Sequence, residues 1–331
     1  MASKPDVLAR FFPDRFILWL IGAVAAATVL PVRGWAAEAV DGLTLAAIFA
    51  LFFLHGVRLP REALISGITH WRLHLAILAS TFLVFPMAGL GLAAVFPGLL
   101  TPELWTGILF LCALPSTVQS SIAYTSMAGG NVAGAVAAAA FSNLIGVFLT
   151  PLLVGLLLEA QGAAISLSGI GKIIALLFLP FLLGHAMRPL LLRLVKDRPR
   201  LTTVVDKGTI LLAVYGAFSA AVVDGIWSRV PPSELGILAA FCALILAIVL
   251  GATWAIGRFG GFSAESRAAI LFCGSVKSLA SGAPMARILF PGAAAGMVIL
   301  PVMLFHTMQL VVCAWIAAHM AAQKRPLTRS A

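Results

Sequence analysis

Lys277 is the residue of this sequence with the clearest potential for chemistry. It stands inside a long apolar stretch, in the segment 274–284 (GSVKSLASGAP), which mixes glycine, hydroxyl residues and proline. A charge at the centre of a bilayer costs at least ~3 kcal/mol, so this side chain is expected to face protein or water. The nearest acidic residues in apolar runs are Asp41, Asp206 and Asp224, which lie toward the ends of those runs. Lys277 therefore has no counter-ion near the middle of the membrane.

Several interpretations of Lys277 are open. Its ammonium could bind an anionic substrate, replace a bound metal cation, or release its proton in a proton-coupled cycle. Snorkelling to an interface, the alternative without a function, is disfavoured because Lys277 stands near mid-span. Lys277 and Ser281 are also four residues apart and would share a helix face, as in a Ser–Lys hydrolase. No Gly-x-Ser-x-Gly or His-Glu-x-x-His motif supports such an enzyme, so we predict that the chain is not one.

A second polar segment, 115–121 (PSTVQSS), interrupts another apolar stretch. Proline, glycine and hydroxyl residues at mid-span weaken a helix and free backbone carbonyls, which membranes tolerate where the backbone lines a cavity. Alternatively, each hydroxyl bonds a carbonyl one turn back within an intact helix. We predict a substrate or ion site where the two segments meet. The candidate residues are Pro115, Ser116, Thr117, Gln119, Ser120, Ser121, Asn143, Ser275, Lys277, Ser278, Ser281, His306 and Gln309. For Asn143, His306 and Gln309, interhelical hydrogen bonding is the open alternative.

The composition excludes a water-soluble protein. Hydrophobic residues make up 61% of the chain, charged residues only 10%, and the mean hydropathy is +1.07. The net charge of +10 does not indicate nucleic-acid binding, because the basic residues lie between apolar runs, where they set membrane topology. All four cysteines fall inside apolar runs, without zinc-type spacing or a disulfide pattern. We expect the lipid bilayer as surroundings and no cofactor other than Na⁺ or H⁺ as a coupling ion.

Ten apolar segments have about the length of a membrane span. They are approximately 16–32, 37–57, 73–96, 104–127, 132–157, 170–191, 207–227, 234–256, 265–289 and 295–319. With the N-terminus in the cytoplasm, 17 Lys and Arg residues fall on the inner side and four on the outer side. This asymmetry predicts a multi-pass protein of the plasma or inner membrane with both termini in the cytoplasm.

The two halves of the chain resemble each other at an offset of 162 residues. The triplet Ile-Leu-Phe at 108–110 recurs at 270–272, and the glycine pair of 130 and 134 recurs at 292 and 296. Five spans in each half would place the halves in opposite orientations, an arrangement common in alternating-access transporters. We therefore predict one transporter domain over 1–331, built from a repeat of about 10–158 and a second of about 168–320.

The polar segments also carry a family resemblance that covers nearly the whole chain. The strings that carry it are ALPSTVQSS (113–121), GGNVAG (129–134), FSNLIGVFLTPLL (141–153), FCGSVKSLASGAPMA (272–286), WRLH (71–74) and TFLVFP (81–86). They resemble the bile acid:sodium symporter family, and most closely its branch of sodium/bile acid cotransporter 7-like proteins. The resemblance implies an all-α fold of ten spans with a core and a panel domain, in which broken spans 4 and 9 cross. Substrate would sit between the domains, and better-understood branches carry an organic anion with two sodium ions.

The sequence departs from those branches where they hold sodium. Their ninth span carries a glutamate and a Gln-Asn pair, whereas 272–278 here reads FCGSVKS without a carboxylate. The stretch 135–140, where hydroxyl ligands would stand, is nearly all alanine. An ammonium also repels a nearby cation, so conventional two-sodium coupling is disfavoured. We predict a secondary transporter of a small organic anion, sodium-independent or proton-coupled, with a non-transporting regulator of ion homeostasis as the alternative.

Overall fold

The computed structural model describes residues 16–59, 70–159, 167–225, 230–290 and 292–323, with the backbone alone for 167–175. Both termini, whose basic residues contribute to the predicted orientation, lie outside the described residues. Every regular element within those ranges is helical. The elements are α2 (Phe16–Val29), α3 (Trp35–Arg58), α5 (Trp71–Ala79), the π-helical turn η1 (Ser80–Val84), α6 (Phe85–Val95), α7 (Pro102–Ala113), α8 (Gln119–Met127), α9 (Val132–Glu159), α10 (Leu167–Ala186), α11 (Arg188–Asp197), α12 (Pro199–Val223), α13 (Pro232–Phe259), α14 (Ala264–Gly274), α15 (Leu279–Leu289) and α16 (Ala294–Gln323).

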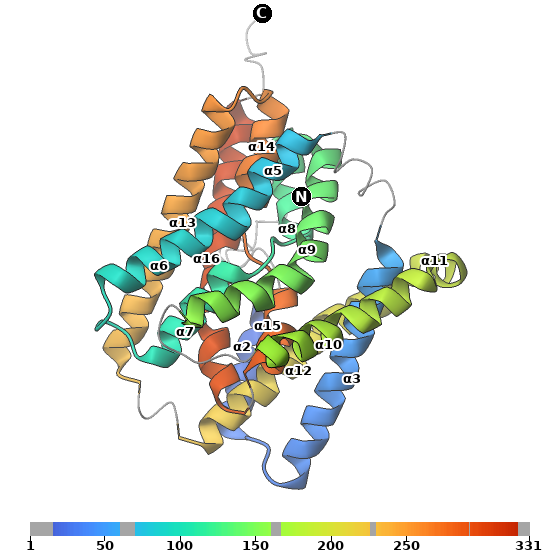
Figure 1. Ribbon diagram of the computed structural model, residues 1–331, viewed down its shortest axis with the longest axis vertical. Coiled ribbons are helices and arrows are strands. Elements are labelled where there is room, and N and C mark those ends of the chain that lie inside the picture. Colours follow the sequence, from blue (N-terminus) through green and yellow to red (C-terminus); the bar gives the residue numbers. More distant parts are fainter. Residues whose placement is uncertain (1–15, 60–69, 160–166, 226–229, 291, 324–331) are drawn as a thin grey trace, which may run out of the picture.

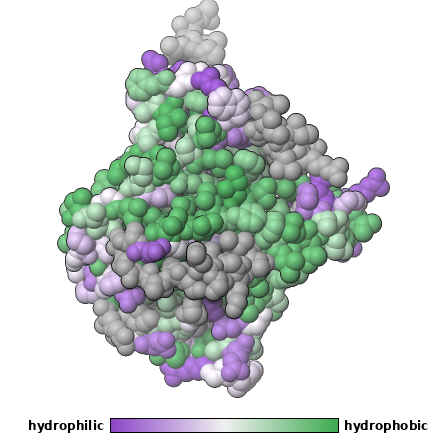
Figure 2. All heavy atoms as spheres, in the orientation of Figure 1, coloured by the Kyte–Doolittle hydropathy of each residue, from purple (hydrophilic) through white to green (hydrophobic). Residues whose placement is uncertain are grey.

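Seven of these helical stretches are long and apolar enough to cross a bilayer. They are α3, α5 to α6 through η1, α9, α12, α13, α14 to α15 through their break, and α16. The helices α2 and α7 are apolar but shorter, and α10 bends by 89° into α11. Hydrophobic side chains cover a broad band across the face shown in Figure 2. The chain is a helical membrane protein, as predicted, whereas its ten spans stay a prediction.

Two of the predicted span boundaries are wrong. The sequence places a span at 170–191, but α10 ends at Ala186 and a separate helix begins at Arg188. Pro189 has no N–H group to continue the α10 ladder, and the leucines that follow it hide this break from a hydropathy count. The next span was expected at 207–227, but α12 begins at Pro199, about two turns earlier.

The helices form two bundles that are joined along one side (Figure 1). In the four-helix bundle, α10 packs along α3, and α12 packs between α2 and α3. The second bundle contains α5 to α9 and α13 to α16, with α16 packed against α7, α8 and α13. We call it the crossing bundle, because the two interrupted helical stretches α7–α8 and α14–α15 belong to it. The bundles meet where α12 contacts α15 and α16, and where α9 contacts α10. The rings of Phe148 on α9 and Phe178 on α10 lie 4.2 Å apart between centroids at the second of these contacts.

Glycine allows α3 and α10 to touch backbone to backbone. A Cβ atom on Gly56 would lie 2.0 Å from the Phe181 carbonyl oxygen, and one on Gly184 would lie 1.9 Å from the Phe53 carbonyl oxygen. We expect Gly56→Ala and Gly184→Ala each to cost about 1–3 kcal/mol, because the two helices must separate. The matched control is Gly42→Ala on α3, where a Cβ has nothing within 4 Å and the added helix propensity is slightly stabilising. Unfolding temperatures in detergent measure the difference, and equal values for Gly42→Ala and Gly184→Ala would contradict the contact.

Two helical stretches are interrupted in the same way. α7 ends at Ala113 and α8 begins at Gln119, while α14 ends at Gly274 and α15 begins at Leu279. α14 begins 162 residues after α7, at Ala264 against Pro102. α16 likewise begins 162 residues after α9, at Ala294 against Val132. Both polar segments identified in the sequence therefore fall between short helices, and the intact-helix alternative does not hold at the breaks themselves.

Candidate functional site

The two breaks cross and are bonded to each other. The Ser278 N–H donates to the Pro115 carbonyl oxygen at 2.9 Å, which joins the two breaks through the backbone. The Ser116 hydroxyl donates to the Cys273 carbonyl oxygen at 2.6 Å. All four residues are buried. The crossing thus supplies hydrogen-bond partners for backbone that no longer belongs to a helix, as membrane depth requires.

Local sequence explains why each helix stops at the crossing. Pro115 lacks an N–H group and forces the preceding Leu114 into an extended conformation (φ −70°, ψ 154°), which ends α7. The proline ring rests on Gly146 of α9, where a Cβ would lie 2.8 Å from the Pro115 Cβ. At the other break, the Ser278 hydroxyl accepts from the Ser281 N–H at 3.1 Å and so caps the start of α15.

The Lys277 ammonium lies in a cradle of three backbone carbonyls. Its Nζ donates to Thr81 O at 2.7 Å, Cys112 O at 2.8 Å and Leu114 O at 2.6 Å. The Phe85 ring covers the group, with its centroid 4.0 Å from Nζ. The side chain is fully buried, and the ion pairs among the described residues do not involve it. The cation is therefore held by carbonyl dipoles and an aromatic face.

The Thr81 carbonyl is free because of the π-helical turn and the proline after it. In an α-helix the Phe85 N–H would bond Thr81 O, but in η1 it bonds Ser80 O instead. The next possible donor is position 86, which is a proline without an N–H. Nothing in the helix can then satisfy Thr81 O, and the Lys277 ammonium takes the vacant place.

The other two cradle carbonyls belong to the C-terminal end of α7. Because the chain leaves the helix after Ala113, the carbonyls of Cys112 and Leu114 lack intrahelical donors. The Ser116 N–H, which would bond Cys112 O in a continuous helix, donates instead to the Ser142 hydroxyl at 3.1 Å. A helix C-terminus carries partial negative charge, so an ammonium is favoured there.

The hydrogen-bond count of the cradle matches a charged ammonium. An ammonium has three N–H donors and no acceptor, and three carbonyl oxygens receive them. A neutral amine would direct its lone pair at one of these oxygens and leave that oxygen without a donor. The geometry also leaves no donor for a further ligand in this conformation, so Lys277 does not contact substrate here.

Gln309 on α16 fixes the backbone of Lys277. Its Oε1 accepts from the Lys277 N–H at 2.7 Å, and its Nε2 donates to the Lys277 carbonyl at 2.8 Å. Its Nε2 also lies 2.8 Å from Nδ1 of His306, which is half-buried. This pairing is the interhelical alternative considered for Gln309, and it acts on the residue that carries the charge.

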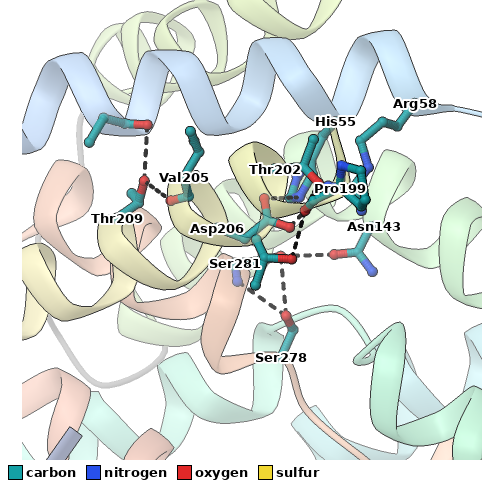
Figure 3. A network of polar contacts seen from close by, with 12 residues as sticks. His55, Arg58, Asn143, Pro199, Thr202, Val205, Asp206, Thr209, Ser278 and Ser281 are labelled. Atoms are coloured by element: carbon teal, nitrogen blue, oxygen red, sulfur yellow. Dashed lines mark hydrogen bonds and ion pairs between the residues drawn. The ribbon is translucent and has the colours of Figure 1, made fainter. Parts of the chain in front are cut away.

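Asn143 on α9 links the two breaks from a third helix. Its Nδ2 donates to Ser116 O at 2.8 Å and to Ala139 O at 2.9 Å, while its Oδ1 accepts from the Ser281 hydroxyl at 2.8 Å. Figure 3 shows Ser281 between Asn143 and Ser278. Asn143 is half-buried, so it bonds between helices and still borders open space.

The remaining candidates divide into two groups. The hydroxyls of Ser121 and Ser275 donate one turn back, to Thr117 O at 2.6 Å and Leu271 O at 2.5 Å, as the alternative without a site requires. The first turn of α8 is open: Gln119 is exposed, and Ser120 is half-buried with its hydroxyl 2.5 Å from that of Thr117. The candidate side chains that are not buried are therefore those of Gln119, Ser120, Asn143 and His306.

The Ser–Lys arrangement considered from the sequence does not form. Lys277 precedes α15, so the four-residue spacing to Ser281 does not place them on one helix face. The Ser281 hydroxyl donates to Asn143, and the Lys277 ammonium donates to carbonyls. A nucleophile and its base must be hydrogen-bonded to each other, and Lys277 and Ser281 are bonded to other groups instead.

Sequence reasoning missed Thr81, Phe85, Cys112, Leu114 and Ser142 as parts of the site. Thr81 contributes its backbone carbonyl, which has no signature in residue type. One signal was present, because Pro86 at mid-span removes a helix donor and must leave a carbonyl nearby without a partner. This signal places an unpaired carbonyl near Pro86, but the π-helical register of η1 decides that it is Thr81 O.

Two broken helices that cross at a buried charge inside an all-helical membrane protein are typical of secondary transporters. The sequence model of the SBF-like CPA transporter family matches residues 14–322. A protein of Pseudomonas aeruginosa, named as uncharacterized, is 51% identical over 316 residues, 95% of each chain. The Escherichia coli protein named "Putative symporter YfeH" is 48% identical over 314 residues, again 95% of each chain. Sodium/bile acid cotransporter 7 of Danio rerio is 25% identical over 317 residues, 92% of this chain and 93% of the relative.

The chain is therefore a membrane transporter, and it belongs to the SBF-like CPA transporter family within the bile acid:sodium symporter family.

Proposed function

We propose that this protein is a secondary transporter of a small organic anion in which Lys277 serves as a built-in cation. The observation that carries the proposal is the ammonium held by three carbonyls where two broken helices cross. A sodium ion bound at the crossing would have to be released in each transport cycle, whereas the ammonium of Lys277 is covalently attached to the protein and stays. Transport would then depend on the anion itself and not on a sodium gradient.

The ligand chemistry of the crossing favours this interpretation over sodium coupling. Sodium prefers several oxygen ligands, and the carbonyls best placed to provide them already accept from Lys277. No carboxylate stands in the segment 272–278. A sodium ion next to the ammonium would be repelled in a medium of low dielectric constant. Proton coupling through Lys277 is the remaining alternative, and it predicts a pH dependence that Lys277 alone confers.

The charge balance of the crossing favours an anionic substrate. In this proposal the Lys277 ammonium supplies a positive charge, and the ion pairs among the described residues leave it without an acidic partner. The nearby first turn of α8 offers polar groups in Gln119 and Ser120. The side-chain amide of Gln119 and the α8 N-terminus supply donors that a carboxylate or sulfonate accepts from, whereas both amide N–H bonds of Asn143 are already donated to backbone carbonyl oxygens.

Alternating access is supported by the way in which the two bundles meet. The Arg287 guanidinium at the end of α15 pairs with Asp41 near the start of α3. A Cβ on Gly296, near the start of α16, would lie 2.9 Å from the Ala221 Cβ on α12. Under the proposed topology, with both termini in the cytoplasm, these contacts lie at the outer end of the molecule. The four-helix bundle and the crossing bundle would be the panel and core domains, which separate there when the site opens outward.

The equal spacing of helix starts supports ten spans built from two inverted repeats. The interrupted pair α7–α8 is followed by the long α9, and the interrupted pair α14–α15 is followed by the long α16. Both sets begin 162 residues apart, which agrees with the offset found in the sequence. Counting α2, α10 and the interrupted pair α7–α8 as spans as well gives five per half, so equivalent elements would run in opposite directions.

Anion exchange in liposomes tests the proposed function. Purified protein is reconstituted into vesicles loaded with one of a panel of bile salts, steroid sulfates and small carboxylates, and entry of the labelled anion is followed. We expect counterflow of at least one anion in potassium buffer without sodium, and no counterflow of neutral analogues. Empty vesicles supply the background. A protein that acts only as a regulator would exchange nothing from the panel.

A binding test that needs no substrate concerns sodium. We expect wild-type protein to unfold at the same temperature in Na⁺ and in K⁺ at matched ionic strength, from about pH 5.5 to about pH 9. A bound ion would raise the stability by RT ln(1 + [L]/Kd), so its absence leaves the two curves superimposed. The four buried cysteines make unfolding easy to follow with a thiol-reactive dye. Na⁺-specific stabilisation would favour a sodium symporter instead. A pH dependence of the unfolding temperature that is lost in Lys277→Met would make proton coupling the next property to test in transport assays.

A further inference from the structure

The short helix α11 differs from the other helices in its position. It follows α10 after a bend of 89°, so it lies nearly perpendicular to α10, and the two helices have the length and apolar composition of a span only when they are taken together. None of its ten residues is buried, although it packs against α3 and α12 along one side (Figure 1). A helix that turns sharply out of a membrane span lies along the membrane surface.

The side chains of α11 divide it into three strips. Leu191, Leu192 and Val195 are half-buried and lie on the side toward α3 and α12. Leu190 and Leu194 are 78% and 47% exposed, although a leucine strip of this kind is unfavourable in water. The exposed strip needs a covering, and the bilayer beside α10 is the apolar phase in reach.

The third strip of α11 is basic and continues into the next segment. The residues 188–200 contain five basic side chains and one acidic side chain, Asp197. Arg193 and Lys196 on the helix are exposed, as are Arg198 and Arg200 after it. Exposed leucines flanked by arginine and lysine are the pattern of helices that bind in the plane of an anionic membrane surface.

We propose that α11 is an interfacial lipid-binding helix. Leu190 and Leu194 enter the boundary of the acyl chains, and Arg193, Lys196 and Arg200 bind the phosphates of anionic phospholipids. The helix packs on α3 and α12, the two longest elements of the four-helix bundle, so the lipid contact holds that bundle at a fixed depth. This role does not depend on what the protein transports, and the two proposals fail separately.

The test compares phospholipid binding by the full-length protein and two matched variants. Protein is extracted from nanodiscs of phosphatidylglycerol and phosphatidylcholine in equal amounts, and the retained lipids are counted by native mass spectrometry. We expect wild type to retain phosphatidylglycerol preferentially and Arg193→Gln/Lys196→Gln to lose about tenfold or more of that preference, since each basic residue near an anionic surface contributes roughly fivefold. The control Arg33→Gln/Arg258→Gln removes the same charge from exposed positions away from α11 and should keep the wild-type preference.

A second measurement checks the apolar strip. An environment-sensitive fluorophore attached at Leu190→Cys should be quenched by lipids that carry a quencher near the headgroup, and much less by quenchers deep in the acyl chains. The native cysteines are buried and do not compete for the label. Equal phosphatidylglycerol retention by both double variants overturns the proposal. Two results together would also overturn it in favour of a second copy of the chain. Unlabelled Leu190→Cys would form disulfide-linked dimers in high yield, and the labelled protein would be shielded from all lipid quenchers.

Discussion

Replacing Lys277 with methionine should lower the unfolding temperature on the order of 10 °C. Methionine fills a similar volume, so the loss does not come from a cavity. It comes from Thr81, Cys112 and Leu114, whose buried carbonyls lose their donor. Removing one side of a buried charged hydrogen-bond network costs roughly 3–5 kcal/mol. Lys207→Met is the matched control, because that lysine also lies over a ring, 5.1 Å from the Phe16 centroid, but is only half-buried.

Rescue by a small cation distinguishes a cation site from general destabilisation. Lys277→Ala leaves the cradle open, and ethylammonium added to this variant can donate to the same carbonyls. We expect ethylammonium to raise the unfolding temperature of Lys277→Ala with no effect on wild type, and ethanol at equal concentration to raise neither. The idea of a built-in cation fails if Lys277→Met unfolds at the wild-type temperature, or if ethanol rescues as well as ethylammonium.

The sequence predicts the place of the site because polar residues are expensive in a bilayer. Lys277 and the two segments around Pro115 and Ser278 stand out against an apolar background, and the structure brings them together at the crossing. The same reasoning predicts the helical membrane class and the position of both breaks. Prediction from residue types succeeds where the side chain itself makes the contact or breaks the helix.

The partners of Lys277 were not predictable from residue types. All three acceptors are backbone carbonyls, and their availability depends on where α7 ends and on the register of η1. Pro86 removes a donor, but a one-residue shift in the turn decides which carbonyl it frees. Charge compensation in this site is therefore a property of the fold, and a search for a carboxylate partner could not find it.

The bend before α11 shows a related limit of hydropathy. Leucines follow directly after Arg188 and Pro189 and extend the apolar run of α10, and the prediction extended the helix through them to residue 191. Hydropathy sums over a window and does not record direction, whereas Pro189 decides the direction by removing one N–H group. The exposed leucines on α11 became visible as a surface strip only once the 89° bend was known.

Joining the two bundles at the end where α12 meets α16 should abolish transport reversibly. A Cβ on Gly296 would lie 2.9 Å from the Ala221 Cβ, so cysteines at both positions reach disulfide geometry after the helices move apart by about 1 Å. If α12 must leave α16 for the site to open at that end, oxidation of Ala221→Cys/Gly296→Cys lowers anion counterflow to the level of empty vesicles. Reduction restores it, because the cysteines themselves do not lie at the crossing.

A cross-link within one bundle is the control for this experiment. A Cβ on Gly130 would lie 2.7 Å from the Ala268 Cβ, and both positions belong to the crossing bundle. Oxidised Gly130→Cys/Ala268→Cys should keep its counterflow, since a rigid bundle moves as a unit. If the linked Ala221→Cys/Gly296→Cys protein exchanges anion at the wild-type rate, the bundles do not separate at this end. Opening would then have to occur by motion inside the crossing bundle, which the control cross-link would block instead.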